Sequence, residues 1–154
     1  MSYPHIYIDH GSFLCDEELK VDGSNFIDWY QRLRGILYVN DVLHVIQEPL
    51  GDAPDDSASE EEYEEYSTRR TLFIVVQCTM LYSMELELRV CFKNTNTYDM
   101  TDELKALFIS QVKVAQYECL DEFLSMKIEE NTCLDSHLAK MHGIHKRLVD
   151  VFDY

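Results

Sequence analysis

The sequence predicts an all-helical protein, because apolar residues recur every three or four positions in three separate segments. The segments run from Phe26 to Leu37, from Leu104 to Phe123 and from Leu138 to Phe152. Each pattern marks an apolar stripe along one side of a helix, and bundles form when such stripes pack together. With the shorter elements between them, these segments predict a bundle of about six helices.

A turn and a cap precede the first helix. Asp22-Gly23 is a turn pair, and Ser24 or Asn25 can accept hydrogen bonds from the first free backbone N–H groups. A lone tryptophan on an amphipathic helix is typical of a core anchor, so we expect Trp29 inside. The buried face of this helix is predicted to consist of Phe26, Trp29, Tyr30, Leu33, Ile36 and Leu37.

The segments around the first helix are predicted to be irregular. Residues 1–20 are expected to form an extended N-terminal arm, because the side chains of residues 3–8 alternate with the two-residue period that is typical of extended chain. Asp41 is positioned to cap a short helix that Pro49 ends. Residues 51–65 are expected to form an acidic loop, whose glutamates from Glu60 onward also suit the first turns of a helix.

Two alternatives remain open for residues 72–92. The run from Leu72 to Val76 is rich in strand-favouring residues, and the run from Glu85 to Phe92 alternates with period two. Read from the residues alone, both runs predict strands of a hairpin, which gives a mixed α/β fold.

The C-terminal third follows a plainer helical pattern. Its first stripe consists of Leu104, Phe108, Val112, Ala115, Cys119 and Phe123, with a bend expected near Gln111. Asp135 or Ser136 is expected to cap the last helix. The inner face of that helix is predicted to carry Leu138, Met141, Ile144, Leu148 and Phe152.

Composition restricts the partners. The 29 acidic residues outnumber the 13 basic ones, and a net charge of −16 repels a phosphate backbone, so we expect no direct nucleic acid binding. Five widely spaced cysteines fit reduced core thiols better than a disulfide framework. No stretch is apolar for long enough to span a bilayer, and residues 1–10 lack the features of a secretory signal. We therefore expect a cytoplasmic protein without a membrane partner.

No motif predicts catalysis or ligand binding. His137, His142 and His145 do not converge on one side of a helix that turns about 100° per residue. No cysteine lies in a recognisable nucleophile motif, and the five glycines form no phosphate-binding loop. The sequence therefore predicts a protein that is not an enzyme, with no catalytic residue, metal ligand, cofactor or small-molecule partner.

The segment from Leu19 to Trp29 resembles the opening of the Gag polyprotein of copia-type LTR retrotransposons, especially those of plants. It contains a leucine, a Gly-Ser-Asn turn, an aromatic residue and a tryptophan in the order of that family. The likeness continues through residues 104–108 and 137–144, and it covers the span from 19 to 150. The signature positions in this chain are Gly23, Asn25, Trp29, Leu33, Leu37, Leu104 and Phe108.

This resemblance implies that residues 21–154 form a helical domain like the N-terminal part of the Gag capsid, with residues 72–92 in helices. Met84 stands where that family has a proline at a helix junction. The resemblance further implies a structural role in particle assembly, through association with itself or with full-length Gag, for a truncated or domesticated fragment. The zinc knuckle of later Gag segments has no counterpart here. The alternative is an acidic protein-interaction adaptor of mixed α/β fold with no capsid role.

Overall fold

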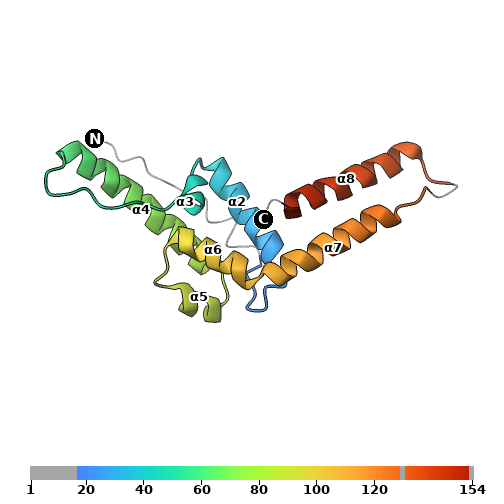
Figure 1. The fold of residues 1–154 in the computed structure, drawn as a ribbon, viewed down its shortest axis with the longest axis horizontal. Helices are drawn as coiled ribbons and strands as arrows, with labels where there is room; N and C mark the ends of the chain where they lie inside the picture. Colours follow the sequence, from blue (N-terminus) through green and yellow to red (C-terminus); the bar gives the residue numbers. More distant parts are fainter. Residues whose placement is uncertain (1–16, 129–130, 153–154) are drawn as a thin grey trace. The chain divides into compact units, whose positions relative to one another are not determined.

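The fold is known from a computed structural model that describes residues 17–128 and 131–152, with side chains described as far as Val149 (Figure 1). The described residues form seven helices and no strand, which confirms the predicted all-helical class. Most of the expected arm over residues 1–20 lies outside the described residues. The helices are α2 (Phe26–Val39), α3 (His44–Gln47), α4 (Glu60–Tyr82), α5 (Leu86–Phe92), α6 (Thr97–Leu107), α7 (Ile109–Ser125) and α8 (Leu134–Phe152).

Residues 72–92 are helical, as the resemblance implies, and the alternative of a strand hairpin in a mixed α/β fold is wrong. Helix α4 begins at a capping box, in which Ser59 and Glu62 exchange hydrogen bonds, and it continues to Tyr82. Its buried residues include Phe73, Val76 and Met80, which are three or four positions apart, and Leu72 beside Phe73. Packing along that stripe overrides the strand preference of the individual residues. The same capping box ends the acidic loop at Ser59 and not at residue 65.

The chain divides into two compact units, which consist of residues 1–104 and 105–154. Unit 1 holds 21 acidic and seven basic side chains, whereas unit 2 holds eight and six. The core of unit 1 lies among α2, α3, α4, α5 and the start of α6. Its fully buried side chains are Leu19, Phe26, Trp29, Leu33, Leu37, Val45, Val76, Met80, Met84, Met100 and Leu104.

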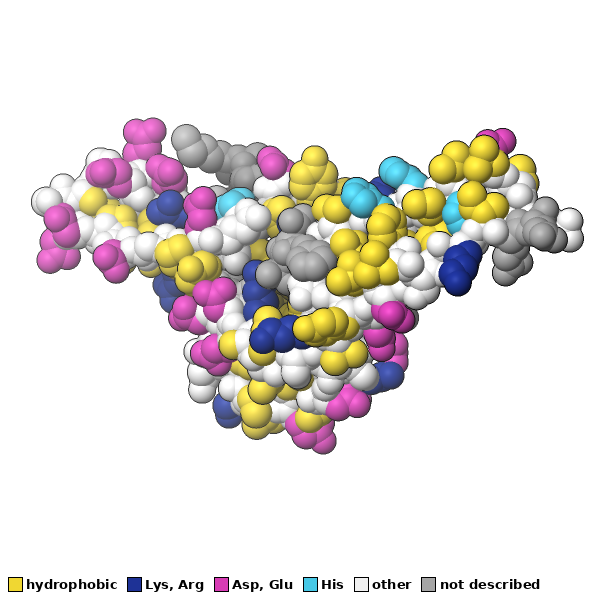
Figure 2. Space-filling view, turned by 45° about the vertical axis from the view of Figure 1, so that its right-hand side comes forward, with side chains coloured by type: hydrophobic (Ala, Val, Ile, Leu, Met, Phe, Trp, Pro, Cys, Tyr) yellow, Lys and Arg dark blue, Asp and Glu magenta, His cyan; other side chains and the backbone are white. Residues whose placement is uncertain are grey.

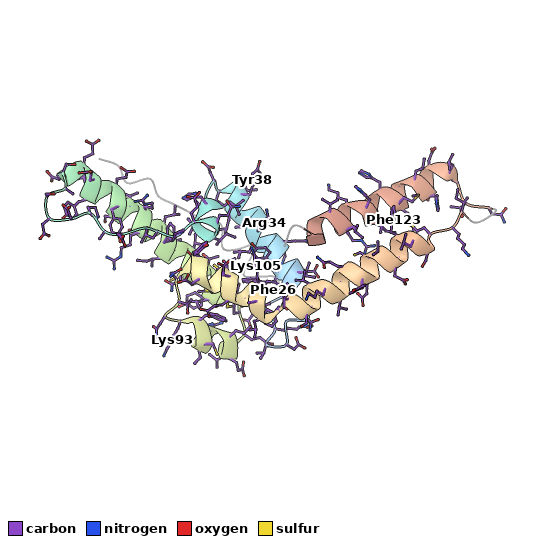
Figure 3. The ribbon with its side chains drawn as sticks, viewed as in Figure 1. Phe26, Arg34, Tyr38, Lys93, Lys105 and Phe123 are labelled. Atoms are coloured by element: carbon purple, nitrogen blue, oxygen red, sulfur yellow. The ribbon has the colours of Figure 1, made fainter. Side chains whose placement is uncertain are left out.

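Unit 2 is a helical hairpin in which α7 and α8 lie side by side (Figure 1). An ion pair joins the two helices, because Arg147 Nη2 on α8 lies 2.6 Å from Glu122 Oε2 on α7. The bend that we expected near Gln111 lies at Phe108, which is the N-cap of α7. Phe123 is marked between the two helices in Figure 3.

The inner face of α8 differs from its prediction by one position. His137 is buried, whereas Leu138 is 52% exposed. Ile144 is buried, and Met141 and Leu148 are half-buried. These inner positions step by four, three and four residues from His137, and Leu138 lies about 100° away from His137 around the helix. Phe152, which was also predicted on the inner face, lies beyond the last residue whose side chain is described.

The cysteines are less buried than predicted. Cys119 is a buried free thiol, but Cys78, Cys91 and Cys133 are exposed free thiols, so they are not core residues. Cys15 lies outside the described residues. Within the described part of the chain, no helix combines the length and the apolar character needed to cross a membrane.

Candidate functional site

The signature residues Gly23 and Asn25 build the turn before α2. Gly23 adopts a left-handed backbone conformation with φ of 69°, which glycine adopts without steric cost. The Asn25 side chain ties this turn to the preceding segment, because its Oδ1 accepts from Lys20 N–H at 2.9 Å and its Nδ2 donates to the Glu18 carbonyl at 2.8 Å. Both residues are buried, so they position the chain and present no exposed group.

Trp29 joins α2 to the end of α4. Its ring is 1% exposed, and its Nε1 donates to the carbonyl oxygen and to Oγ of Ser83. Next to this contact, Leu19 N–H donates to the Ser83 carbonyl, and Glu85 N–H donates to the Leu19 carbonyl. The other signature residues, Leu33, Leu37, Leu104 and Phe108, are also buried. All seven are therefore internal residues that hold helices in place.

The described residues contain no arrangement that indicates catalysis. No group of three or more His, Cys, Asp or Glu side chains in residues 17–128 and 131–149 is placed to hold a metal ion. His137 is buried, whereas His142 and His145 are exposed.

The resolved pKa shifts belong to exposed turn and cap residues. A hydrogen bond from Lys20 lowers the pKa of Glu17, and the same hydrogen bond raises the pKa of Lys20. Hydrogen bonds from nearby serines lower the pKa values of the Asp22, Asp55 and Glu62 carboxyls. All these shifts favour charged surface groups, which is the pattern of local structure and not of a reaction centre.

The most unusual surface is the second apolar face of α7. One side of this helix is buried through Val112 and Cys119. Away from that side lie four exposed apolar residues: Val114 (53% exposed), Tyr117 (75%) and Leu124 (72%) on the opposite side, and Leu120 (38%) at its flank. Hereafter these four residues are the outer face of α7. A helix that is apolar on opposite sides is typical of one that is covered on both.

Neighbouring features extend the apolar character of unit 2. Leu134, Leu138 and Val149 on α8 are also exposed. Hydrophobic side chains and the α8 histidines gather over the hairpin in the space-filling view (Figure 2). Unit 2 has a net charge of −2, whereas unit 1 has a net charge of −14. The outer face of α7 therefore lies in the nearly neutral part of the chain.

Comparisons with protein-family models, with curated proteins and with solved structures found no match. The resemblance to Gag therefore depends on the order and spacing of the residues given above. The outer face of α7 was not predicted, although its signal is present in the sequence. Val114, Tyr117, Leu120 and Leu124 form a second stripe with helical spacing beside the buried one.

Proposed function

We propose that this protein is a non-enzymatic, capsid-like structural protein of the kind found in copia-type Gag. It acts in the cytoplasm through contacts with itself or with full-length Gag during particle assembly. The observation that carries this proposal is the outer face of α7, which exposes four apolar side chains away from the buried side of the same helix. A contiguous exposed apolar face of this type marks a protein interaction site in a folded domain.

The positions of the Gag-like signature residues support the proposal. Gly23, Asn25 and Trp29 hold the entry to α2 against the end of α4 through the hydrogen bonds described above. These are the residues that a helical assembly domain needs for a rigid frame, since lattice contacts require surfaces that keep their shape. These hydrogen bonds give a physical reason for the order and spacing of the signature residues.

The charge distribution favours protein partners over RNA. Unit 1 has a net charge of −14, and its acidic residues include five glutamates between positions 60 and 65. Such a surface repels nucleic acid, whereas the nearly neutral unit 2 can approach another protein with little repulsion. Packaging of element RNA would then depend on other parts of a Gag assembly.

The proposal is tested by size-exclusion chromatography with light scattering under reducing conditions. The chain is measured over a concentration series, alone and mixed with an intact copia-type Gag protein. We expect the molar mass to grow with concentration and the chain to elute together with Gag. The Leu124→Ser variant should lose both effects, because it removes one of the most exposed apolar side chains of the outer face.

A matched control is Val39→Ser on α2, which removes an apolar side chain that is 83% exposed in unit 1. This variant should associate like the wild type. A chain that stays monomeric at all concentrations and does not elute with Gag would contradict the proposed function.

A further inference from the structure

Two pairs of side chains on α7 lie symmetrically in sequence around Tyr117. Lys113 and Asp121 lie four residues before and after it, and Val114 and Leu120 lie three residues before and after it. On a helix, four residues correspond to about 6 Å along the axis and to about 40° of rotation from Tyr117. Lys113 and Asp121 are both exposed, so they place opposite charges at equal distances from Tyr117, and Leu124 of the outer face lies beyond Asp121.

We infer that two copies of this chain pair through α7 in antiparallel orientation, with the two-fold axis beside Tyr117. This inference deepens the self-association proposed above and rests on it. Around such an axis, a residue that precedes Tyr117 by some number of positions in one copy meets the residue that follows Tyr117 by the same number in the other copy. Lys113 then lies level with the partner copy's Asp121, twice per dimer. Val114, Tyr117 and Leu120 pack between these two ion pairs, and Leu124 lies beyond Asp121.

The charges select both the orientation and the partner. A parallel pair of α7 helices would place Lys113 beside Lys113 and Asp121 beside Asp121, which is repulsive. The antiparallel pair converts the same four charges into two attractive contacts. The surface is therefore complementary to itself, which is the requirement for a two-fold symmetric interface.

The rest of the surface favours pairing through unit 2. The net charge of −14 on unit 1 opposes close contact between two copies of that unit, whereas unit 2 has a net charge of −2. Tyr117, the most exposed residue of the outer face, is of a residue type that interfaces favour. One helix pair forms a small interface, so we expect a weak dimer whose population depends on protein concentration.

Charge reversal tests the pairing on the full chain by sedimentation velocity. Lys113→Glu places two glutamates opposite two aspartates, and Asp121→Lys places two lysines opposite two lysines. We expect each single variant to weaken self-association at least about tenfold. The double variant should dimerise like the wild type, and an equimolar mixture of the two single variants should form a heterodimer. In a parallel pair each single reversal would only replace one like-charge contact by another and would not weaken association. Weakening by both single variants together with recovery in the double variant therefore indicates antiparallel pairing.

Three controls accompany this test. Lys93→Glu changes an exposed lysine next to α5 and should leave association unchanged (Figure 3). Tyr117→Ala should weaken the dimer, whereas Tyr38→Ala on α2 should not, although both tyrosines are 75% exposed. Circular dichroism checks that each variant is folded. The neutral variants Lys113→Gln and Asp121→Asn should weaken the dimer less than the charge reversals do.

The outcomes separate this inference from the proposed function. Wild-type protein that stays monomeric, or charge-reversed variants that associate normally, would overturn pairing through α7. So would the absence of a heterodimer in the mixture of folded single variants. If the chain remains monomeric alone but elutes with intact Gag, only the pairing fails. If it dimerises as described but does not bind Gag, the pairing stands and the Gag-related function fails.

Discussion

Trp29 and Ser83 meet across 54 residues of sequence, where the indole Nε1 donates to the serine carbonyl oxygen at 3.1 Å and to its Oγ at 3.0 Å. Ser83 is the C-cap of α4, so its carbonyl belongs to a helix end whose backbone acceptors need partners from elsewhere. The same carbonyl accepts from Leu19 N–H at 2.8 Å. Three distant segments of unit 1 are therefore joined at one residue.

We predict that Trp29→Phe lowers the free energy of unfolding of unit 1 by about 2 kcal/mol, since it removes two buried hydrogen bonds of the indole and part of a core ring. Urea unfolding followed by circular dichroism measures this change. Ser83→Ala should cost less, because the carbonyl still accepts from the indole. Equal stability of Trp29→Phe and wild type would contradict the importance of this contact.

Gly23 and Gly35 should respond in opposite directions to alanine. Gly23→Ala is expected to destabilise unit 1 by about 1 kcal/mol, because a φ of 69° is unfavourable for a residue with a Cβ. Gly35→Ala, inside α2, should stabilise the helix by about 0.5–1 kcal/mol, as a Cβ there meets nothing within 4 Å. Thermal unfolding of the two variants measures the difference in sign.

Thr97 and Thr101 offer a matched pair of buried hydroxyls on α6. The Thr97 Oγ1 donates to the carbonyl oxygen of Val45 at 2.9 Å, whereas the Thr101 Oγ1 donates within its own helix to the Thr97 carbonyl. Thr97→Val should destabilise unit 1 by about 1–3 kcal/mol, because it leaves the Val45 carbonyl without this donor. Thr101→Val should cost clearly less when both are compared by denaturant unfolding.

The start of α4 should depend on pH. Hydrogen bonds from the backbone N–H and then the hydroxyl of Ser59 lower the pKa of Glu62 below its usual value of 4.5. The pKa of Glu62 is lower in the folded state than in the unfolded state. Its carboxylate therefore stabilises the start of α4 fully when the pH is above the usual pKa, and this stabilisation is lost as the pH falls through the lowered pKa. Amide exchange of Glu60 to Tyr63 should therefore become faster, relative to the intrinsic rate, on acidification from pH 7 to pH 3.

Two serine variants test the origin of that pH dependence. Ser59→Ala should weaken the helix end by about 1 kcal/mol at pH 7 and abolish the acid-induced fraying, because the capping box is gone. Ser67→Ala, at an exposed position inside α4, should retain the pH dependence of the wild type. Fraying that persists unchanged in Ser59→Ala would show that the capping box is not its cause.

Local sequence patterns predicted most of the helices. Asn25 is the N-cap of α2, as its position predicted, but its side chain bonds to Lys20 and Glu18 and makes no capping hydrogen bond to the helix. The stripe from Leu104 to Cys119 located the buried side of α7. The residues from Leu72 to Phe92 were ambiguous, because β-branched residues favour strands in isolation whereas burial at helical spacing decides the outcome. That burial is a tertiary property, which the sequence of one segment does not contain.

The surface of unit 2 shows a different limit of prediction. Leu138 was expected inside because it is apolar, but the neighbouring His137 is buried in its place. A shift by one residue rotates the buried side of a helix by about 100°, and the apolar pattern of α8 is broad enough to permit it. The outer face of α7 was readable as a second stripe, but only the observed exposure distinguishes it from a second core face.

The contact between Leu19 and Met84 has a consequence for synthesis of the chain. These residues form an isolated parallel bridge, and both side chains are fully buried. Bringing Leu19 and Met84 together closes a long loop of chain, and the loss of conformational entropy comes before the contact stabilises the fold. This loop closure slows the formation of unit 1. On the ribosome, the core of unit 1 cannot close until Met84 has left the exit tunnel. Until then, Leu19 and the apolar side of α2 are exposed surfaces that a chaperone can bind.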